Sequence, residues 1–167
     1  MRELQMKPTY ATLKSNHYSS NKYSPNFLDS DEIYTLLGYS LESLRKQNPD
    51  YVNTCAVRMS LALIESGVHF VGRMKIKDGP HKGKTFEPGA KLLADQLARP
   101  GVFGRPDIIA PSDAMSRLSG KKGLILFWKI AGYGGGHIDL IDVSTTVQAC
   151  NSACYFSSKE IWFWPLS

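Results

Sequence analysis

Three side chains of the sequence could together carry out acyl transfer: Cys55, His137 and Asp139. A thiolate can attack a carbonyl carbon, an imidazole can take up and return the proton, and a carboxylate can orient the imidazole. Cys55 is far from the other two along the chain, so only the fold can bring the three together. Whether they form a site therefore depends on the elements that hold them.

Cys55 is predicted to lie in the first turn of a helix within residues 53–67. Asn53 or Thr54 can accept from a free backbone N–H at the start, and Gly67 can end the helix in the left-handed conformation. At this position backbone N–H groups converge and the helix dipole favours a thiolate. The alternative is that Cys55 is a small buried apolar residue.

His137 and Asp139 are predicted on a β-strand. An apolar strand over residues 123–130, a glycine-rich turn over 131–136 and an alternating strand over 137–142 indicate an antiparallel hairpin. Alternate residues of a strand share a face, so the two side chains should be neighbours. The alternative is an ordinary strand histidine beside a turn and a solvent-facing aspartate.

The remaining pattern predicts an α+β fold, with helices first and strands later. Amphipathic or capped segments predict helices near residues 9–15, 29–38, 40–47 and 90–99. Residues 72–89 are predicted to be a long loop with a small hairpin, residues 143–154 a turn and residues 160–165 a last strand. We expect an irregular lead-in over residues 1–28 and a single domain over 29–167.

Composition narrows the class of protein. Hydrophobic residues make up 43% of the 167 residues and charged residues 21%, which indicates a globular protein. No apolar run approaches the roughly 20 residues that span a bilayer, and the amino terminus lacks the apolar core of a Sec signal peptide. Synthesis in the cytoplasm and no membrane partner are therefore expected.

The formal net charge of +5 would suit an anionic polymer, an anionic lipid or a nucleic acid. The basic residues are scattered, however, and the one local cluster, residues 75–84, is interrupted by turn residues. Such a stretch is typical of a solvated loop. No nucleic-acid partner is predicted.

Cys150 and Cys154 stand close together. Two cysteines without further cysteines or histidines nearby are a poor zinc site, because four ligands are needed. We expect a local Cys150–Cys154 disulfide across a tight turn if the protein reaches an oxidising compartment, and the alternative is two reduced thiols. No metal or cofactor is expected.

Four segments together resemble a known family. They are Asn-Thr-Cys-Ala-Val-Arg-Met-Ser at 53–60, Lys-Lys-Gly-Leu-Ile at 121–125, Gly-His-Ile-Asp-Leu at 136–140 and the tryptophan-rich strand at 160–165. In this order and spacing they resemble the type VI secretion amidase effectors of family 4, over about residues 29–167. The resemblance implies a papain-like α+β fold with helices packed on an antiparallel sheet.

The resemblance also implies roles for individual residues. Cys55 matches the family's nucleophile and His137 its general base. Some members place an aspartate between two cysteines of a following Cys-x-x-x-Cys segment, where this chain has Ser152. Asp139 is the preferred third member, because strand geometry places it beside His137, with Ser152 and Asn151 as alternatives.

The implied activity is antibacterial cleavage of the amide between D-glutamate and meso-diaminopimelate in peptidoglycan stem peptides. The type VI machinery would deliver the protein into the periplasm of a rival cell, and a cognate immunity protein would occlude the cleft near residues 72–89 and 132–136. Two alternatives stand beside this function. One is a cysteine hydrolase or acyltransferase of other amide specificity, and the other is a non-catalytic module that binds cell wall or nucleic acid.

Overall fold

The computed structural model describes residues 5–144 and 149–167. The first four residues of the predicted lead-in and part of the turn predicted over 143–154 lie outside this description. The helices are α1 (Tyr10–Ser15), α2 (Ser30–Leu36), α3 (Leu41–Gln47), η1 (Pro49–Val52), α4 (Cys55–Glu65), α5 (Ala90–Leu97), η2 (Pro111–Asp113) and α6 (Ala114–Leu118). The strands are β1 (Met74–Lys75), β2 (Thr85–Phe86), β3 (Asp107–Ile109), β4 (Lys122–Ile130), β5 (Gly136–Asp142) and β6 (Ser158–Pro165).

The main sheet is antiparallel and has the strand order β3-β6-β4-β5. Strand β4 is central, and β5 folds back along it so that Phe127 lies opposite His137 and Ile125 opposite Asp139. The predicted hairpin of residues 123–142 is therefore confirmed. Strand β5 is the last strand in this order, so His137 and Asp139 lie on an edge strand of the sheet.

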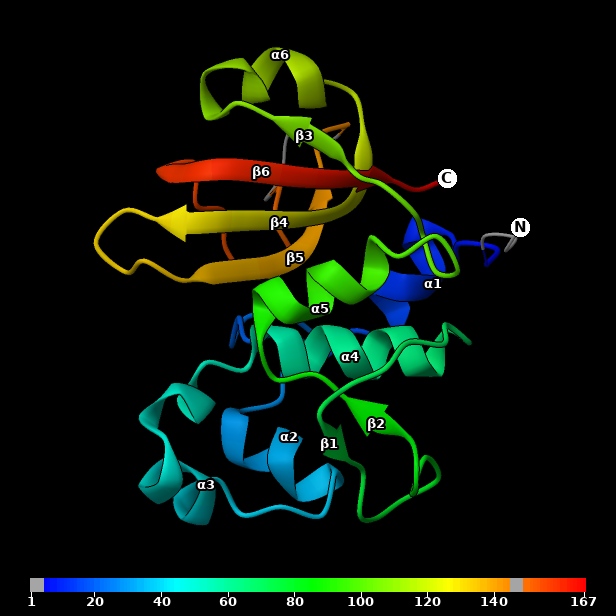
Figure 1. Cartoon of the computed structure of the whole chain (residues 1–167), viewed down its shortest axis with the longest axis vertical. Coiled ribbons are helices and arrows are strands. Elements are labelled where there is room, and N and C mark those ends of the chain that lie inside the picture. Colours follow the sequence, from blue (N-terminus) through cyan, green and yellow to red (C-terminus); the bar gives the residue numbers. More distant parts are fainter. Residues whose placement is uncertain (1–4, 145–148) are drawn as a thin grey trace.

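Helix α4 is the central layer of the molecule, between the main sheet and a lobe formed by α2, α3 and the β1–β2 hairpin (Figure 1). Met59 and Leu63 pack toward the sheet, whereas Val57 and Leu61 pack into the lobe. A helix that is apolar on two sides is buried between layers. Because both sides of α4 are fixed by packing, its first residue, Cys55, has a defined position.

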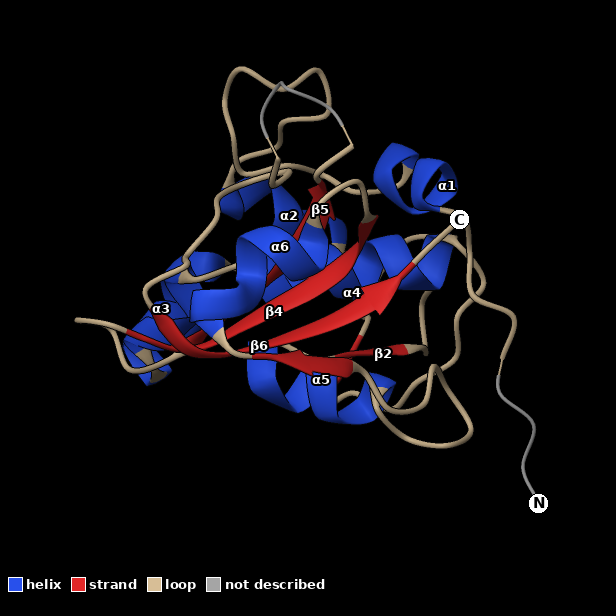
Figure 2. Cartoon of the chain, turned by 90° about the horizontal axis from the view of Figure 1, so that it is seen from above, coloured by secondary structure: helices blue, strands red, loops and turns tan. Residues whose placement is uncertain are grey.

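The two faces of the main sheet are covered differently. Leu124 and Leu126 face α4 and α5, whereas Ile125 and Phe127 pack in a second cluster with residues of α6. Helix α6 lies on the side of the sheet away from α4 and α5 (Figure 1, Figure 2). The alternation along β4 is the two-residue period of a strand buried on both faces.

The lead-in segment is part of this packing. Helix α1 falls within it, and Leu13 is fully buried in the cluster that joins α4 to the sheet. Its carboxyl-terminal part, residues 16–28, passes beside the edge of β5. There Ser19 Oγ donates to the carbonyl of Asn151 at 3.2 Å.

The predicted helices, the small hairpin within residues 72–89 and the last strand are confirmed, with ends that differ by a few residues. A strand not predicted as such, β3, pairs with β6, and Ile109 lies opposite Ile161. Its three residues are too few to show a two-residue period. Within the described residues, no helix is long and apolar enough to cross a membrane.

Candidate active site

Cys55 is the first residue of α4 and is half-buried. Of the two cap residues expected, Asn53 accepts the Cys55 backbone N–H through Oδ1 at a long 3.4 Å. Thr54 makes no cap bond, because its hydroxyl instead accepts from Arg58 Nε at 2.8 Å. The Cys55 N–H is thus held only weakly by the protein, and it lies at the positive end of the helix dipole.

His137 and Asp139 are joined by a side-chain hydrogen bond. The distance between His137 Nε2 and Asp139 Oδ2 is 2.9 Å, and both residues are buried. The same imidazole also meets the nucleophile candidate, because the His137 side chain hydrogen-bonds with Cys55 as well. Since Nε2 is used by Asp139, Nδ1 is the nitrogen left for the sulfur. The fold therefore joins Cys55, His137 and Asp139 in one line of side-chain hydrogen bonds, with His137 in the middle.

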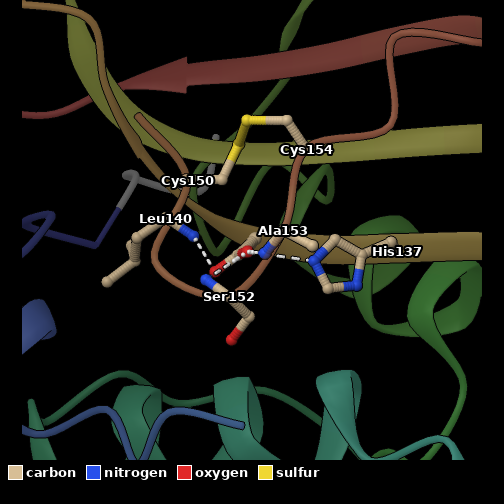
Figure 3. The surroundings of a disulfide bond; sticks show 7 residues. His137, Leu140, Cys150, Ser152, Ala153 and Cys154 are labelled. Carbon is tan, nitrogen blue, oxygen red and sulfur yellow. Dashed lines mark hydrogen bonds and ion pairs between the residues drawn. A yellow bond between two sulfur atoms is a disulfide. The ribbon is translucent and has the colours of Figure 1, made fainter. Parts of the chain in front are cut away.

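Asp139 is fully buried and is held by backbone amides. Leu140 N–H donates to Oδ1 at 2.8 Å, while Ser152 and Ala153 N–H donate to Oδ2 at 2.9 and 3.0 Å. Figure 3 shows Ser152, Ala153, Leu140 and His137 converging on this carboxylate. Buried carboxylates need such donors, because desolvation of an unpaired charge is costly. Asp139 is therefore fixed from three sides.

A disulfide closes the loop that supplies two of these amides. Cys150 and Cys154 are bonded, and their Cα atoms lie 5.5 Å apart (Figure 3). The loop pairs with the outer edge of β5, where Asn151 N–H donates to the carbonyl of Leu140 at 2.9 Å. Ser152, one of the alternatives for the third site residue, thus meets Asp139 through its backbone.

Hydrogen bonding keeps the imidazole of His137 protonated. Burial by itself lowers the pKa of His137, but the bonds to Asp139 and Cys55 raise it further than burial lowers it, to about 10. At neutral pH the ring is then an imidazolium that donates from both nitrogens. Such a ring can stabilise a thiolate on one side while its orientation is fixed on the other.

Two cavities, each of about 260 Å³, meet at the site. Cys55 and Trp128 line one of them, and His137 and Tyr155 line the other. Both cavities are lined by Asn53, Tyr133 and Gly136. Between them the Asn53 amide donates to the Tyr133 hydroxyl at 2.7 Å, which links the start of α4 to the turn between β4 and β5.

Sequence reasoning did not find every residue of this arrangement. The Asn53–Tyr133 bond joins residues 80 positions apart, and His17 lies buried close to the Asp139 carboxylate although it belongs to the polar lead-in. Neither Tyr133 nor His17 stands in a periodic pattern or a motif. An aromatic residue inside the glycine-rich turn, Tyr133, was the one available signal of a contact there.

Solved structures of similar fold cover nearly the whole chain. The type VI effector Tae4 from Enterobacter cloacae matches over 100% of both chains with 19% identity and a TM-score of 0.66. Tae4 in the Tae4–Tai4 effector–immunity complex from Salmonella Typhimurium matches 97% of this chain and 100% of that chain, with 20% identity and a TM-score of 0.66. The chain has the papain-like α+β fold expected from its sequence.

The family follows from a separate comparison. The model described as "Tae4: Type VI secretion system (T6SS), amidase effector protein 4" matches residues 51–164, which include Cys55, His137 and Asp139. The chain therefore belongs to the Tae4 family of type VI secretion amidase effectors. No curated protein sequence gives a significant match.

Proposed function

We propose that this protein is a cysteine amidase that hydrolyses the γ-D-glutamyl–meso-diaminopimelate amide of peptidoglycan stem peptides. The observation that carries the proposal is the line of side-chain hydrogen bonds from Cys55 through His137 to Asp139, at the junction of two cavities. Membership of an amidase effector family supports the reaction class. The net charge of +5 suits an anionic wall polymer.

The reaction would proceed by acyl transfer. The Cys55 thiolate attacks the amide carbonyl, and the negative charge moves to the carbonyl oxygen. The Cys55 backbone N–H, whose bond to Asn53 is long, is placed to stabilise this oxyanion. His137 then gives its proton to the departing amine of diaminopimelate as the C–N bond breaks, leaving a γ-glutamyl thioester on Cys55.

Hydrolysis of the thioester uses the same groups. The now neutral His137 takes a proton from water, and the hydroxide attacks the thioester carbonyl. The C–S bond breaks, the γ-carboxylate of D-glutamate is released, and the thiolate–imidazolium pair is restored. Asp139 touches neither substrate nor water in this scheme. It keeps the imidazole in one orientation and stabilises the positive charge, which its bonds to three backbone amides allow it to do without moving.

The proposal is tested by digesting purified sacculi and separating the soluble products by chromatography with mass detection. We expect fragments in which the D-Glu–diaminopimelate bond has gained one water, with a new amine on diaminopimelate. An unchanged muropeptide pattern would contradict the substrate assignment. In that case rapid alkylation of Cys55 would favour a hydrolase of other amide specificity, whereas sedimentation with sacculi and no product would favour a wall-binding module.

We also propose a compartment and a partner for this activity. The disulfide suits the oxidising periplasm of a target cell, reached through the type VI machinery.

Some of the similar solved structures are complexes of the effector Tae4 with the immunity protein Tai4. The side chain of Tyr133 is 57% exposed at the mouth of the site, so an immunity protein that covers it would block both cavities. Periplasmic expression should lyse cells that tolerate cytoplasmic expression, and coexpression of the partner should restore growth. Equal survival in both compartments would contradict this.

The disulfide should matter more for activity than for folding. A cross-link between cysteines four positions apart closes a short loop and stabilises the fold by only about 2 kcal/mol. The same loop presents the Ser152 and Ala153 amides to Asp139, so its loosening misplaces the carboxylate. We expect the double variant Cys150→Ser, Cys154→Ser to lose about tenfold in kcat, because small displacements at a site are costly in rate.

Peptide hydrolysis measured alongside thermal unfolding checks this expectation. Wild type treated with a phosphine reductant should behave like the double variant, and the reductant should not change the activity of the double variant. A double variant that retains wild-type kcat would show that the loop holds Asp139 without the cross-link.

A further inference from the structure

His17 is a buried histidine outside the proposed triad. It follows helix α1 and is only 2% exposed. Its Nδ1 lies 2.9 Å from Nδ2 of Asn151, while its Nε2 has no hydrogen-bond partner among the described residues. Buried polar atoms are nearly always paired, so an imidazole with one unpaired ring nitrogen stabilises the core less than an apolar side chain of similar size would. The one side-chain hydrogen bond that His17 makes within the described residues is therefore a candidate for a functional role.

That bond reaches the loop that holds Asp139. Asn151 directly precedes Ser152 and Ala153, whose N–H groups donate to the Asp139 carboxylate. The side chain of Asn151 is held by His17 and its carbonyl by the hydroxyl of Ser19 at 3.2 Å. The lead-in thus grips the loop one residue before the two amides.

The same segment is also attached to the start of α4. Arg58 donates to the carbonyls of Tyr18 at 3.2 Å and Leu28 at 2.7 Å. Its Nε donates to the hydroxyl of Thr54, the residue before Cys55. Residues 17–28 therefore connect the helix that carries the thiol with the loop that fixes the carboxylate.

The charge state of His17 is suited to this contact. Burial lowers the pKa of His17, to about 4; Asp139 acts in the opposite direction, and Arg58 and His137 lower it further. These three groups face His17 from α4 and β5. The ring is neutral at physiological pH, so Nδ1 can accept from the Asn151 amide, and no second cation competes with His137 for Asp139.

We propose that His17 is a positioning residue for the proposed amidase reaction. It orients Asn151, and through Asn151 it keeps the Ser152 and Ala153 amides on Asp139, which in turn holds His137 against Cys55. The inference rests on the proposed cysteine mechanism. It gives the lead-in segment a share in setting the reactivity of the thiol.

The test compares His17→Leu with His17→Asn. Leucine fills much of the space but offers no acceptor, so the Asn151 side chain loses its partner, whereas the asparagine oxygen can replace Nδ1. We expect His17→Leu to lower kcat about tenfold with KM unchanged, and His17→Asn to recover most of the loss. Leu13→Ala is the matched control: it removes a fully buried side chain of the same segment and should lower thermal stability without changing kcat.

Alkylation of Cys55 by iodoacetamide gives a second readout that needs no substrate. If Asp139 is held less firmly, the imidazolium that faces the sulfur is stabilised less, so iodoacetamide should alkylate Cys55 more slowly at neutral pH in His17→Leu. The alkylation rate should be that of the wild type in Leu13→Ala. A wild-type alkylation rate and kcat in folded His17→Leu would overturn the proposal, as would the same kcat loss in Leu13→Ala.

Asn151→Ala, on a partly exposed loop, covers the case in which His17→Leu does not fold. It should show the same kcat loss and the same slower alkylation of Cys55, and wild-type behaviour of Asn151→Ala would overturn the proposal. Where both single variants fold, their effects should not add in a double-mutant cycle, because they break one contact. Full additivity would overturn the proposal. If sacculi are not cleaved, the proposed substrate fails, but the alkylation rates still decide the role of His17.

Discussion

Cys55→Ala is expected to abolish amide hydrolysis. No other group in the line of Cys55, His137 and Asp139 can form the acyl intermediate, and loss of a triad nucleophile costs on the order of 10⁶-fold in kcat in a well-studied hydrolase. Alanine is a good helix former, and Cys55 is only half-buried at the first turn of α4, so the fold should be retained. Product formation from sacculi over many hours, compared with a no-enzyme blank, measures the residual rate.

A matched control separates the thiol from its surroundings. Cys55→Ser keeps the side-chain shape and a hydrogen bond to His137 but replaces the nucleophile with a poorer one, so it should be nearly as inactive. One equivalent of iodoacetamide should inactivate the wild type, because Cys150 and Cys154 are protected in a disulfide. Hydrolysis by Cys55→Ala within tenfold of the wild-type rate would remove Cys55 from the mechanism.

Asp139→Asn should cost several orders of magnitude in kcat, up to the roughly 10⁴-fold loss seen when the orienting carboxylate of a serine-hydrolase triad becomes an amide. Asparagine has nearly the same shape, so the loop amides keep an acceptor in part. What is lost is the negative charge that favours the imidazolium of His137. Substrate binding in the two cavities should be unchanged, so the effect should fall on kcat and not on KM.

The pH dependence of activity should also differ between wild type and Asp139→Asn. His137 must be protonated to release the amine, and its pKa is raised to about 10, so wild-type activity should persist at mildly alkaline pH and fall as pH passes about 10. Without the Asp139 charge this alkaline limb should move to lower pH. A Ser152→Ala variant is the control, because alanine keeps the backbone N–H that donates to Asp139, so its alkaline limb should stay in place. An unshifted alkaline limb in Asp139→Asn would contradict the assignment.

The β-hairpin and the helix that begins at Cys55 could be predicted, because residue patterns over a few positions are enough to indicate them. The two-residue period and the glycine-rich turn placed His137 and Asp139 on one face, and the structure brings their side chains within 2.9 Å. The helical spacing after Cys55 and the left-handed Gly67 that follows the helix likewise match the structure. Each of these depends only on backbone geometry over a few residues.

The surroundings of Asp139 could not be predicted, because they depend on contacts between distant segments. The Ser152 and Ala153 amides reach the carboxylate only because the loop pairs with the edge of β5. Nothing in the polar composition of the lead-in indicates that His17 is buried behind that loop. Every residue except proline has a backbone N–H, so residue types do not indicate which amides will donate to a given carboxylate or which distant segments will pack together.

The sequence by itself determined the α+β class, the helix start under Cys55, the strand pair His137 and Asp139, and the family. Local periodicity and motif order were sufficient for these. Only the tertiary structure decided that Asp139 is the residue whose side chain meets His137, that Cys150 and Cys154 are joined beside it, and that residues 17–28 tie the helix to the loop. The physical reason is that a buried carboxylate takes its donors from whichever segments the packed core brings to it.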